Sequence, residues 1–431
     1  MTAEIAILNR GAVALAADSA VTVGDDSGSK AYNTVNKLFT LSKFHPVGIM
    51  MNGNADYMTI PWETVIKLYR EELGTRSFST IAAYARHFVR YLNREFTISH
   101  NDEKDRIHQI WLAYFESLNT ELRQILLDKA NQNPITQTDV NKEFLALVSA
   151  YVSGLREKRT IGQYRSVRSA VTMRRYGQDL SAITKVAFRG RQITRAIARS
   201  LRELAFLILV KDEFRLSTTG IVIAGFGAEE IFPNMCALQC AGKIFGRLKV
   251  KIEPNMAITS KHNESVYIRH FAQGEMVDRF MEGIDPIYSM YIRDGATHLL
   301  ERLATDLVMK YSTGGNALKT RRASSARRTA RKMINEFERS AERFRYGVFV
   351  KPILDIVSIL PKEELAELAG ALVSITSLKR KISFEVETVG GPVDVAVISK
   401  GDGFIWIRRK HYFKPELNPS FLQNYLSSSR A

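Results

Sequence analysis

The chain has 431 residues, of which 45% are hydrophobic, and its 61 lysines and arginines against 45 aspartates and glutamates give a net charge of +16. This length and apolar content exclude a wholly disordered chain, and two cysteines are too few for a disulfide framework. We expect Cys236 and Cys240 to be core thiols. No targeting signal or membrane-spanning run is evident, which predicts a cytoplasmic protein. Eight scattered histidines predict that no metal site is present, and we expect no cofactor.

The chain begins with two short apolar segments, at residues 3–8 and 11–17, which we predict to be strands joined by a turn. Thr2 precedes the first segment and Asp18 ends the second, so the hairpin brings these two residues together. Removal of Met1, which methionine aminopeptidase performs when the next side chain is small, would give Thr2 a free α-amine beside its hydroxyl. Such a residue carries a base and a nucleophile in one place.

The following segment alternates polar loops with further strands and then helices. Residues 25–30 are polar and predict a loop, whereas residues 47–51 predict a strand that ends at Asn52 and Gly53. Pro61 opens a predicted helix that runs to about Glu72, because proline is favoured in a first turn. A second helix is predicted over residues 79–95.

Residues 2–57 resemble a proteasome β subunit, and most closely the bacterial proteasome-like ring peptidase. The matching positions are Thr2, Gly11, Asp18, Lys37 and the loop at residues 52–56. The resemblance implies an N-terminal nucleophile (Ntn) hydrolase with an α+β fold, a four-layer αββα sandwich of two antiparallel sheets flanked by helices. It also implies a homo-oligomeric ring that acts on polypeptide substrates, with an unfoldase or another regulator as a possible partner.

The resemblance implies catalytic roles for Thr2, Asp18, Lys37, Asn52 and Gly53. A cationic Lys37 would lower the pKa of the Thr2 amine, because like charges disfavour protonation of a neighbour, and Asp18 would hold the lysine in place. A backbone N–H of the loop at Asn52 and Gly53 would stabilise the negative oxygen of a tetrahedral intermediate.

Several positions around this centre differ from the family pattern. The usual aspartate and serine are not retained in register at residues 386–391, where Glu385 and Glu387 are the neighbouring candidates for positioning the amine. Gln273 replaces a serine and can still hydrogen-bond an amine. The same alignment places Val21, Val35 and Met50 along the substrate pocket, which predicts a preference for substrates with an apolar side chain beside the scissile bond. If these differences disrupt the positioning of the Thr2 amine, the chain is instead a ring subunit that does not cleave substrates.

The chain is about twice as long as the family fold requires, and the surplus is helical. We predict a core over residues 1–98, a helical insertion over 99–209, a second core part over 210–286, a basic helical insertion over 287–346 and a C-terminal core part over 347–431.

The basic insertion leaves three interpretations open. The alternative to a threonine peptidase is an inactive scaffold whose arginines engage nucleic acid or an acidic partner protein. A run of charges is also the usual composition of a solvated helix face, and no recognised nucleic-acid-binding motif accompanies it. The arginines concerned are Arg321, Arg322, Arg327, Arg328 and Arg331.

Overall fold

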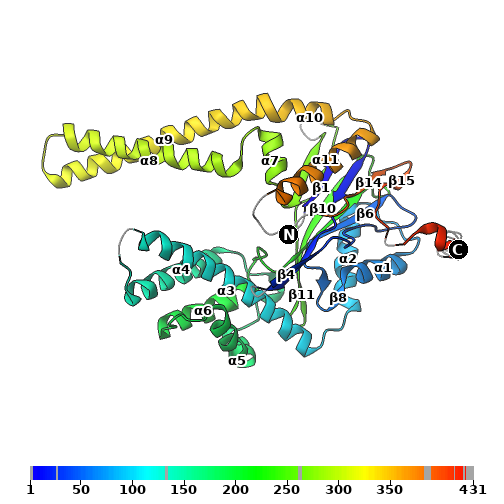
Figure 1. Cartoon of the computed structure of the whole chain (residues 1–431), viewed down its shortest axis with the longest axis horizontal. Helices are drawn as coiled ribbons and strands as arrows, with labels where there is room; N and C mark the ends of the chain where they lie inside the picture. The colour runs from blue at the N-terminus through cyan, green and yellow to red at the C-terminus, as the bar shows by residue number, and fades with distance from the viewer. Residues whose placement is uncertain are drawn as a thin grey trace. The chain divides into compact units, whose positions relative to one another are not determined.

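The computed structural model describes residues 3–25, 28–131, 134–260, 265–382, 390–411, 413–420 and 423, and their side chains except at 22–25, 28–31 and 415. The chain forms two compact units, whose helices and strands are labelled in Figure 1. Unit 1 comprises Met1–Leu38, Glu230–Asn234 and Met256–Ala431, and unit 2 comprises Phe39–Glu229 and Met235–Asn255. Both contain antiparallel strands and helices, which confirms the α+β class; the four-layer sandwich stays a prediction.

Unit 1 is built on a five-stranded sheet in which each pair of neighbouring strands is antiparallel. The sheet confirms the two predicted N-terminal strands, although the second begins two residues later than predicted. Every residue of these two strands is buried, which explains their continuous apolar sequence. In sheet order the strands are β13 (Tyr267–Ala272), β1 (Ala3–Leu8), β2 (Val13–Ala17), β14 (Asp394–Ser399) and β15 (Gly403–Arg408).

A two-stranded hairpin follows β2, where the sequence predicted a loop. Strands β3 (Val21–Asp25) and β4 (Gly28–Tyr32) pair in antiparallel register, with Val21 opposite Tyr32. The prediction of a loop over residues 25–30 is therefore wrong for Asp25, which ends β3, and for residues 28–30. This polar segment can form a strand because the strand conformation depends on backbone pairing, which polar side chains do not prevent.

Helix α11 (Lys362–Lys381) covers one face of this sheet. Its residues Leu365, Ala369 and Leu372 recur at helical spacing and pack in one buried cluster with Ile5 and Ile7 of β1. The shorter helices of the same unit are α7 (Glu275–Glu282) and α10 (Lys351–Val357). Unit 1 also contains strand β12 (Met256–Ala257), a π-helical turn at Tyr346–Val350 and a 3₁₀ turn at Pro415–Leu417.

Two long helices of unit 1, α8 (Pro286–Tyr311) and α9 (Asn316–Arg345), pair as an extended helical hairpin (Figure 1). A turn at residues 312–315 separates the two helices, and the extended backbone of Gly315 marks the beginning of α9. Among the described residues, no helix is both long enough and apolar enough to cross a membrane.

Unit 2 contains the second sheet, whose strands follow one another in the order β11, β10, β9, β6 and β5. Helices α1 (Trp62–Leu73) and α2 (Ile81–Glu95) pack with this sheet in one buried cluster that includes Trp62, Tyr69 and Phe88. Cys236 and Cys240 lie in β10 as buried free thiols, and burial raises the pKa of each to about 11. The strands of this sheet are β5 (Leu38–Thr40), β6 (Val47–Gly53), β9 (Thr219–Gly225), β10 (Asn234–Ile244) and β11 (Arg247–Ile252), and β7 (Asp56–Tyr57) pairs with β8 (Ile60–Pro61) in a separate two-stranded sheet.

A group of four helices follows in the same unit, in the segment where the sequence predicts a helical insertion over residues 99–209. Two of them start with a reciprocal capping box, formed by Ser99 with Asp102 and by Thr136 with Asp139. Their apolar faces share one buried core that includes Trp111. The helices are α3 (His100–Ala130), α4 (Gln137–Glu157), α5 (Ser169–Ala187) and α6 (Arg195–Val210), with a 3₁₀ turn at Gly162–Tyr164.

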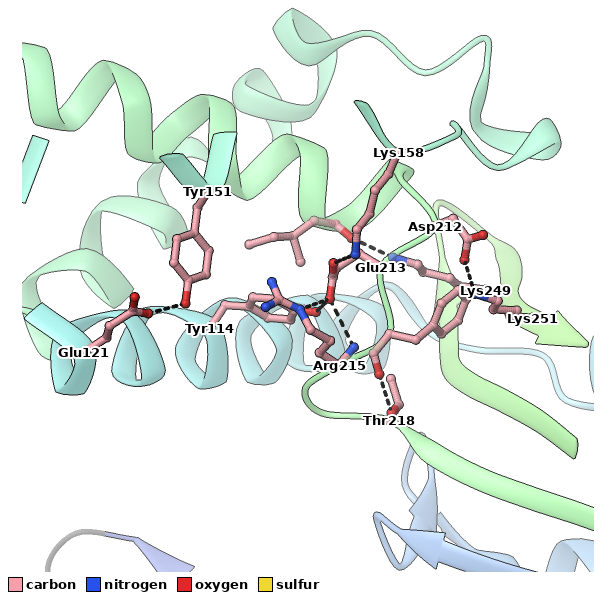
Figure 2. A network of polar contacts seen from close by, with 12 residues as sticks. Tyr114, Glu121, Tyr151, Lys158, Asp212, Glu213, Arg215, Thr218, Lys249 and Lys251 are labelled. Carbon is pink, nitrogen blue, oxygen red and sulfur yellow. Dashed lines mark hydrogen bonds and ion pairs between the residues drawn. The ribbon is translucent and has the colours of Figure 1, made fainter. Parts of the chain in front are cut away.

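Lys249 of β11 is fully buried between this helical group and the sheet of unit 2 (Figure 2). Its ammonium group donates a hydrogen bond of 2.6 Å to the carbonyl of Ile208 near the end of α6, and lies 5.1 Å from the ring centroid of Phe214. Burial lowers the pKa of Lys249 to about 7, because removal from water disfavours the charged form.

This buried lysine predicts that unit 2 becomes more stable as the pH rises above 7. The folded state binds the lysine proton less tightly than the unfolded state does, so the free energy of unfolding rises with pH between about 7 and 10.4. One such proton contributes at most about 1.4 kcal/mol per pH unit. Urea denaturation at several pH values should show this slope in the wild type and its loss in Lys249→Met. Lys251→Met, a more exposed lysine on the same strand, should retain it.

Candidate functional site

A buried ion pair lies at one end of the unit 1 sheet. Asp18 follows β2 and Lys37 immediately precedes β5, and the Lys37 Nζ to Asp18 Oδ1 distance is 2.6 Å. The side chains of Lys37 and Asp18 are only 4% and 0% exposed. A charge pair this deeply buried is stable only when further hydrogen bonds compensate for lost hydration.

Three backbone N–H groups supply those further bonds to Asp18. Its Oδ1 accepts from Ala3 at 3.1 Å, and its Oδ2 accepts from Ala20 at 3.2 Å and from Gly390 at 3.0 Å. The backbone N–H of Asp18 also donates to the carbonyl of Ala3 at 3.0 Å. The carboxylate therefore ties together the start of β1, the end of β2 and the segment before β14, and presents one oriented ammonium group beside them.

Ser19 extends the same arrangement. Its hydroxyl donates to the Pro392 carbonyl at 2.5 Å, and its own carbonyl accepts from the Val35 N–H at 3.1 Å. This second bond fixes the segment that carries Lys37. Val21 and Val35, which were predicted to line a substrate pocket, lie in this part of unit 1 and are both partly buried.

Gln273 lies at the same end of the sheet as Asp18. Ala3 is opposite Ala272 in the register of β1 with β13, and Gln273 is the next residue along. Its side chain is buried between the end of β13 and the first residue of α7. The structure thus brings Gln273 to the strand end where Ala3 meets Asp18.

Two buried carboxylates at this end were missed by the sequence analysis. Glu4 and Asp394 both lie opposite Ala17 of β2, one on each neighbouring strand, and are 1% and 2% exposed. Directly opposed residues share one face of a sheet, so both acids lie on the face away from α11. Asp394 accepts from the Lys410 N–H at 2.8 Å and pairs with its ammonium group. The signal that could have identified each of them in the sequence was a single acidic residue within an otherwise apolar segment.

Asn52, Gly53 and Met50 belong to unit 2, where they occupy the C-terminal half of β6. Gly53 has a φ of +84°, and a Cβ there would lie 2.2 Å from the carbonyl oxygen of Thr218, so only glycine fits. Asn52 is partly exposed and opposes Gly220 in β9, whereas Met50 is completely buried.

Three predicted site residues fall outside the described part of the chain. These are Thr2, Glu385 and Glu387, so their predicted roles stay predictions. The nearest described residue to the proposed nucleophile is Ala3, to which Thr2 is covalently bonded.

The arginines predicted to contact a polyanion all lie on α9. Three of them bind within the helical hairpin or its turn: Arg322 donates to the Thr313 carbonyl, Arg327 donates to the Thr305 hydroxyl, and Arg331 pairs with Glu301. Within the described residues, Arg321 and Arg328 have no ion-pair partner. Only part of the basic charge of α9 is therefore left for a binding partner.

Comparison with known proteins gave matches among solved structures alone. No family model matches the chain, and no curated protein sequence matches it. An Anbu (Gly-1) mutant from Hyphomicrobium sp. strain MC1 is similar at 10% identity and a TM-score of 0.27, covering 99% of this chain and 96% of that one. Anbu from Yersinia bercovieri, described as an ancestral beta-subunit, is similar at 8% identity and a TM-score of 0.26, covering 99% and 95%.

These comparisons correct the family assignment drawn from the sequence. The chain was assigned to the Ntn hydrolases of the proteasome β subunit and bacterial ring peptidase family, whereas the similar solved structures are Anbu proteins. Those matches do not show a catalytic threonine in this chain, so the assignment is wrong as made.

Proposed function

We propose that the chain hydrolyses amide bonds, with Thr2 as its nucleophile after removal of Met1. The observation that supports this most strongly is the buried Lys37–Asp18 ion pair, whose carboxylate binds the N–H of Ala3 at 3.1 Å. A structural role alone does not require a lysine ammonium group buried at the beginning of the first strand. A nucleophile at the chain start would use one, because a fixed positive charge keeps the neighbouring amine neutral and able to act as the base.

The proposed reaction proceeds by acyl transfer. The Thr2 amine, directly or through one water molecule, takes the hydroxyl proton, and the Thr2 oxygen attacks the carbonyl carbon of the substrate amide. The carbon–nitrogen bond breaks, the leaving amine receives the proton, and an ester remains on Thr2. Water then hydrolyses the ester and regenerates the hydroxyl. Lys37 would stabilise the neutral amine and the developing negative charge, while Asp18 positions Lys37.

The first test is covalent labelling of the native protein with a β-lactone or epoxyketone. We expect labelling of the peptide that begins at Thr2, with Met1 absent from the intact mass. Thr2→Ala should abolish labelling and reduce amide hydrolysis by at least about 10³-fold, as expected when a nucleophile is removed. Thr2→Ser, which keeps a hydroxyl and an amine, should retain both labelling and amide hydrolysis.

Two outcomes would contradict the proposal: a native protein that keeps Met1, or labelling that survives Thr2→Ala. Either would favour the binding function suggested by α9, which carries ten lysines and arginines against three glutamates. That excess of seven positive charges suits a nucleic acid or an acidic protein. A polypeptide substrate and assembly into a homo-oligomeric ring stay predictions, to be tested by peptide digestion and by the mass of the native particle.

A further inference from the structure

A basic cavity of about 720 Å³ opens among three helices of unit 2, and none of the residues of the proposed hydrolase lines it. The beginning of α3, the middle of α5 and one residue of α6 form its lining. Cavities of this size accommodate small-molecule ligands with several functional groups. Its charged and titratable lining residues are His100, Lys104, Arg174, Arg175, Asp179 and Arg202.

The lining carries more positive than negative charge. Lys104 and Asp179 pair with each other, with the Lys104 Nζ 2.9 Å from Asp179 Oδ1. Arg174 on α5 and Arg202 on α6 have no ion-pair or hydrogen-bond partner among the residues that the structure describes, and both are exposed. The cavity therefore holds two guanidinium groups whose donors are available to a ligand.

Arg175 and His100 are held in place at the wall of this cavity. The Arg175 guanidinium lies 2.6 Å from His100 Nδ1 and 3.5 Å from the carboxylate of the buried Glu103. Acceptance of a bond at Nδ1 leaves the neutral imidazole with its proton on Nε2, so the ring supplies one further donor. Gln178 and Ser181, which also line the cavity, add neutral polar groups.

We propose that this cavity binds a ligand with two or more adjacent phosphate groups. Arginine forks match phosphate oxygens in pairs, and the two available arginines come from different helices, so one monovalent anion does not engage both fully. The cavity is also much larger than one phosphate group needs. An inorganic polyphosphate and a nucleoside triphosphate share the required chemistry, and neither depends on Thr2.

Calorimetric titration of the full-length protein tests this proposal. In buffer with 150 mM salt and no magnesium, we expect one site per chain for inorganic tripolyphosphate. Arg174→Ala/Arg202→Ala should weaken this binding at least about tenfold, as the loss of charge-assisted hydrogen bonds implies. Arg123→Ala/Arg195→Ala removes two exposed arginines from α3 and α6 outside the lining and should leave affinity unchanged.

Equal weakening by both double variants, or several equivalent sites per chain, would overturn the proposal, because general charge attraction explains either result. A nucleoside triphosphate should be titrated in parallel. Binding equal to that of tripolyphosphate identifies the phosphate chain as the recognised group, and tighter binding that needs the same two arginines identifies a nucleotide. Failure of both ligands to bind would also refute the site, whatever the outcome of labelling at Thr2.

Discussion

Asp18→Ala should lower the free energy of unfolding of unit 1 by about 3–5 kcal/mol, the range for breaking a buried ion pair by removing one partner. The substitution leaves the Lys37 ammonium buried without its carboxylate and deprives the N–H groups of Ala3, Ala20 and Gly390 of their acceptor. Urea denaturation gives the total change. Hydrogen exchange on peptides from β1 and β2 should localise it, because faster exchange is expected where the carboxylate joins those strands.

The double variant Asp18→Asn/Lys37→Met is the decisive companion. It removes both charges while keeping an acceptor for the backbone, so its loss of stability should be smaller than that of Asp18→Ala. Lys67→Ala, which breaks an exposed pair with Glu63 of the same 2.6 Å length, should cost less than about 1 kcal/mol. Equal losses from Asp18→Ala and Lys67→Ala would mean that burial does not make the Asp18 pair important.

The strands that carry Asp18 were predictable because their physical signal is local. Residues 3–8 and 13–17 are short, apolar and interrupted by a turn, and burial of both strand faces demands that composition. The contact between Asp18 and Lys37, by contrast, has no local signal in the sequence. It rested on resemblance to a family that the comparisons do not support, yet the two residues do meet in the structure.

Contacts between distant segments explain what the sequence did not reveal. The strand at residues 28–32 is polar, and only its pairing with β3 makes it a strand. Glu4 and Asp394 become neighbours of Ala17 through sheet register, which a one-dimensional pattern does not encode. The Ala20 and Gly390 donors are backbone groups, so no residue type signals them.

The polar network around Glu213 joins residues that are far apart in the sequence (Figure 2). Glu213 is buried, and its carboxylate binds the Lys158 ammonium at 2.5 Å, the Tyr114 hydroxyl at 2.7 Å and the Arg215 guanidinium at 2.8 Å. Burial raises the pKa of Glu213, but hydrogen bonds from these three residues outweigh it and bring the pKa down to about 2.

Glu213→Ala should therefore destabilise unit 2 by about 1–3 kcal/mol, the cost of leaving a buried hydroxyl without its acceptor, because the Lys158 and Arg215 side chains are 40% and 57% exposed and can be hydrated. Two cations lose their shared carboxylate, and the buried Tyr114 hydroxyl loses its acceptor. Because the folded-state pKa is lower than the unfolded one, the wild-type carboxylate stabilises the fold above about pH 4.5, and this contribution falls as the pH decreases towards 2. Glu213→Gln should remove that acid dependence while retaining more stability than the alanine variant.

The matched control is Glu203→Ala, in the same helical group. Glu203 pairs with Arg156 at 2.6 Å, but its side chain is 38% exposed, so its removal should cost less than about 1 kcal/mol. Urea denaturation at pH 7 and at pH 4, with hydrogen exchange on peptides from α3, α4 and α6, separates the two cases. If Glu213→Ala proved as mild as Glu203→Ala, water would have to replace the lost carboxylate. Such a mild effect would mean that helix packing stabilises this part of unit 2 without the network. The expected loss would mean that the network itself contributes to its stability.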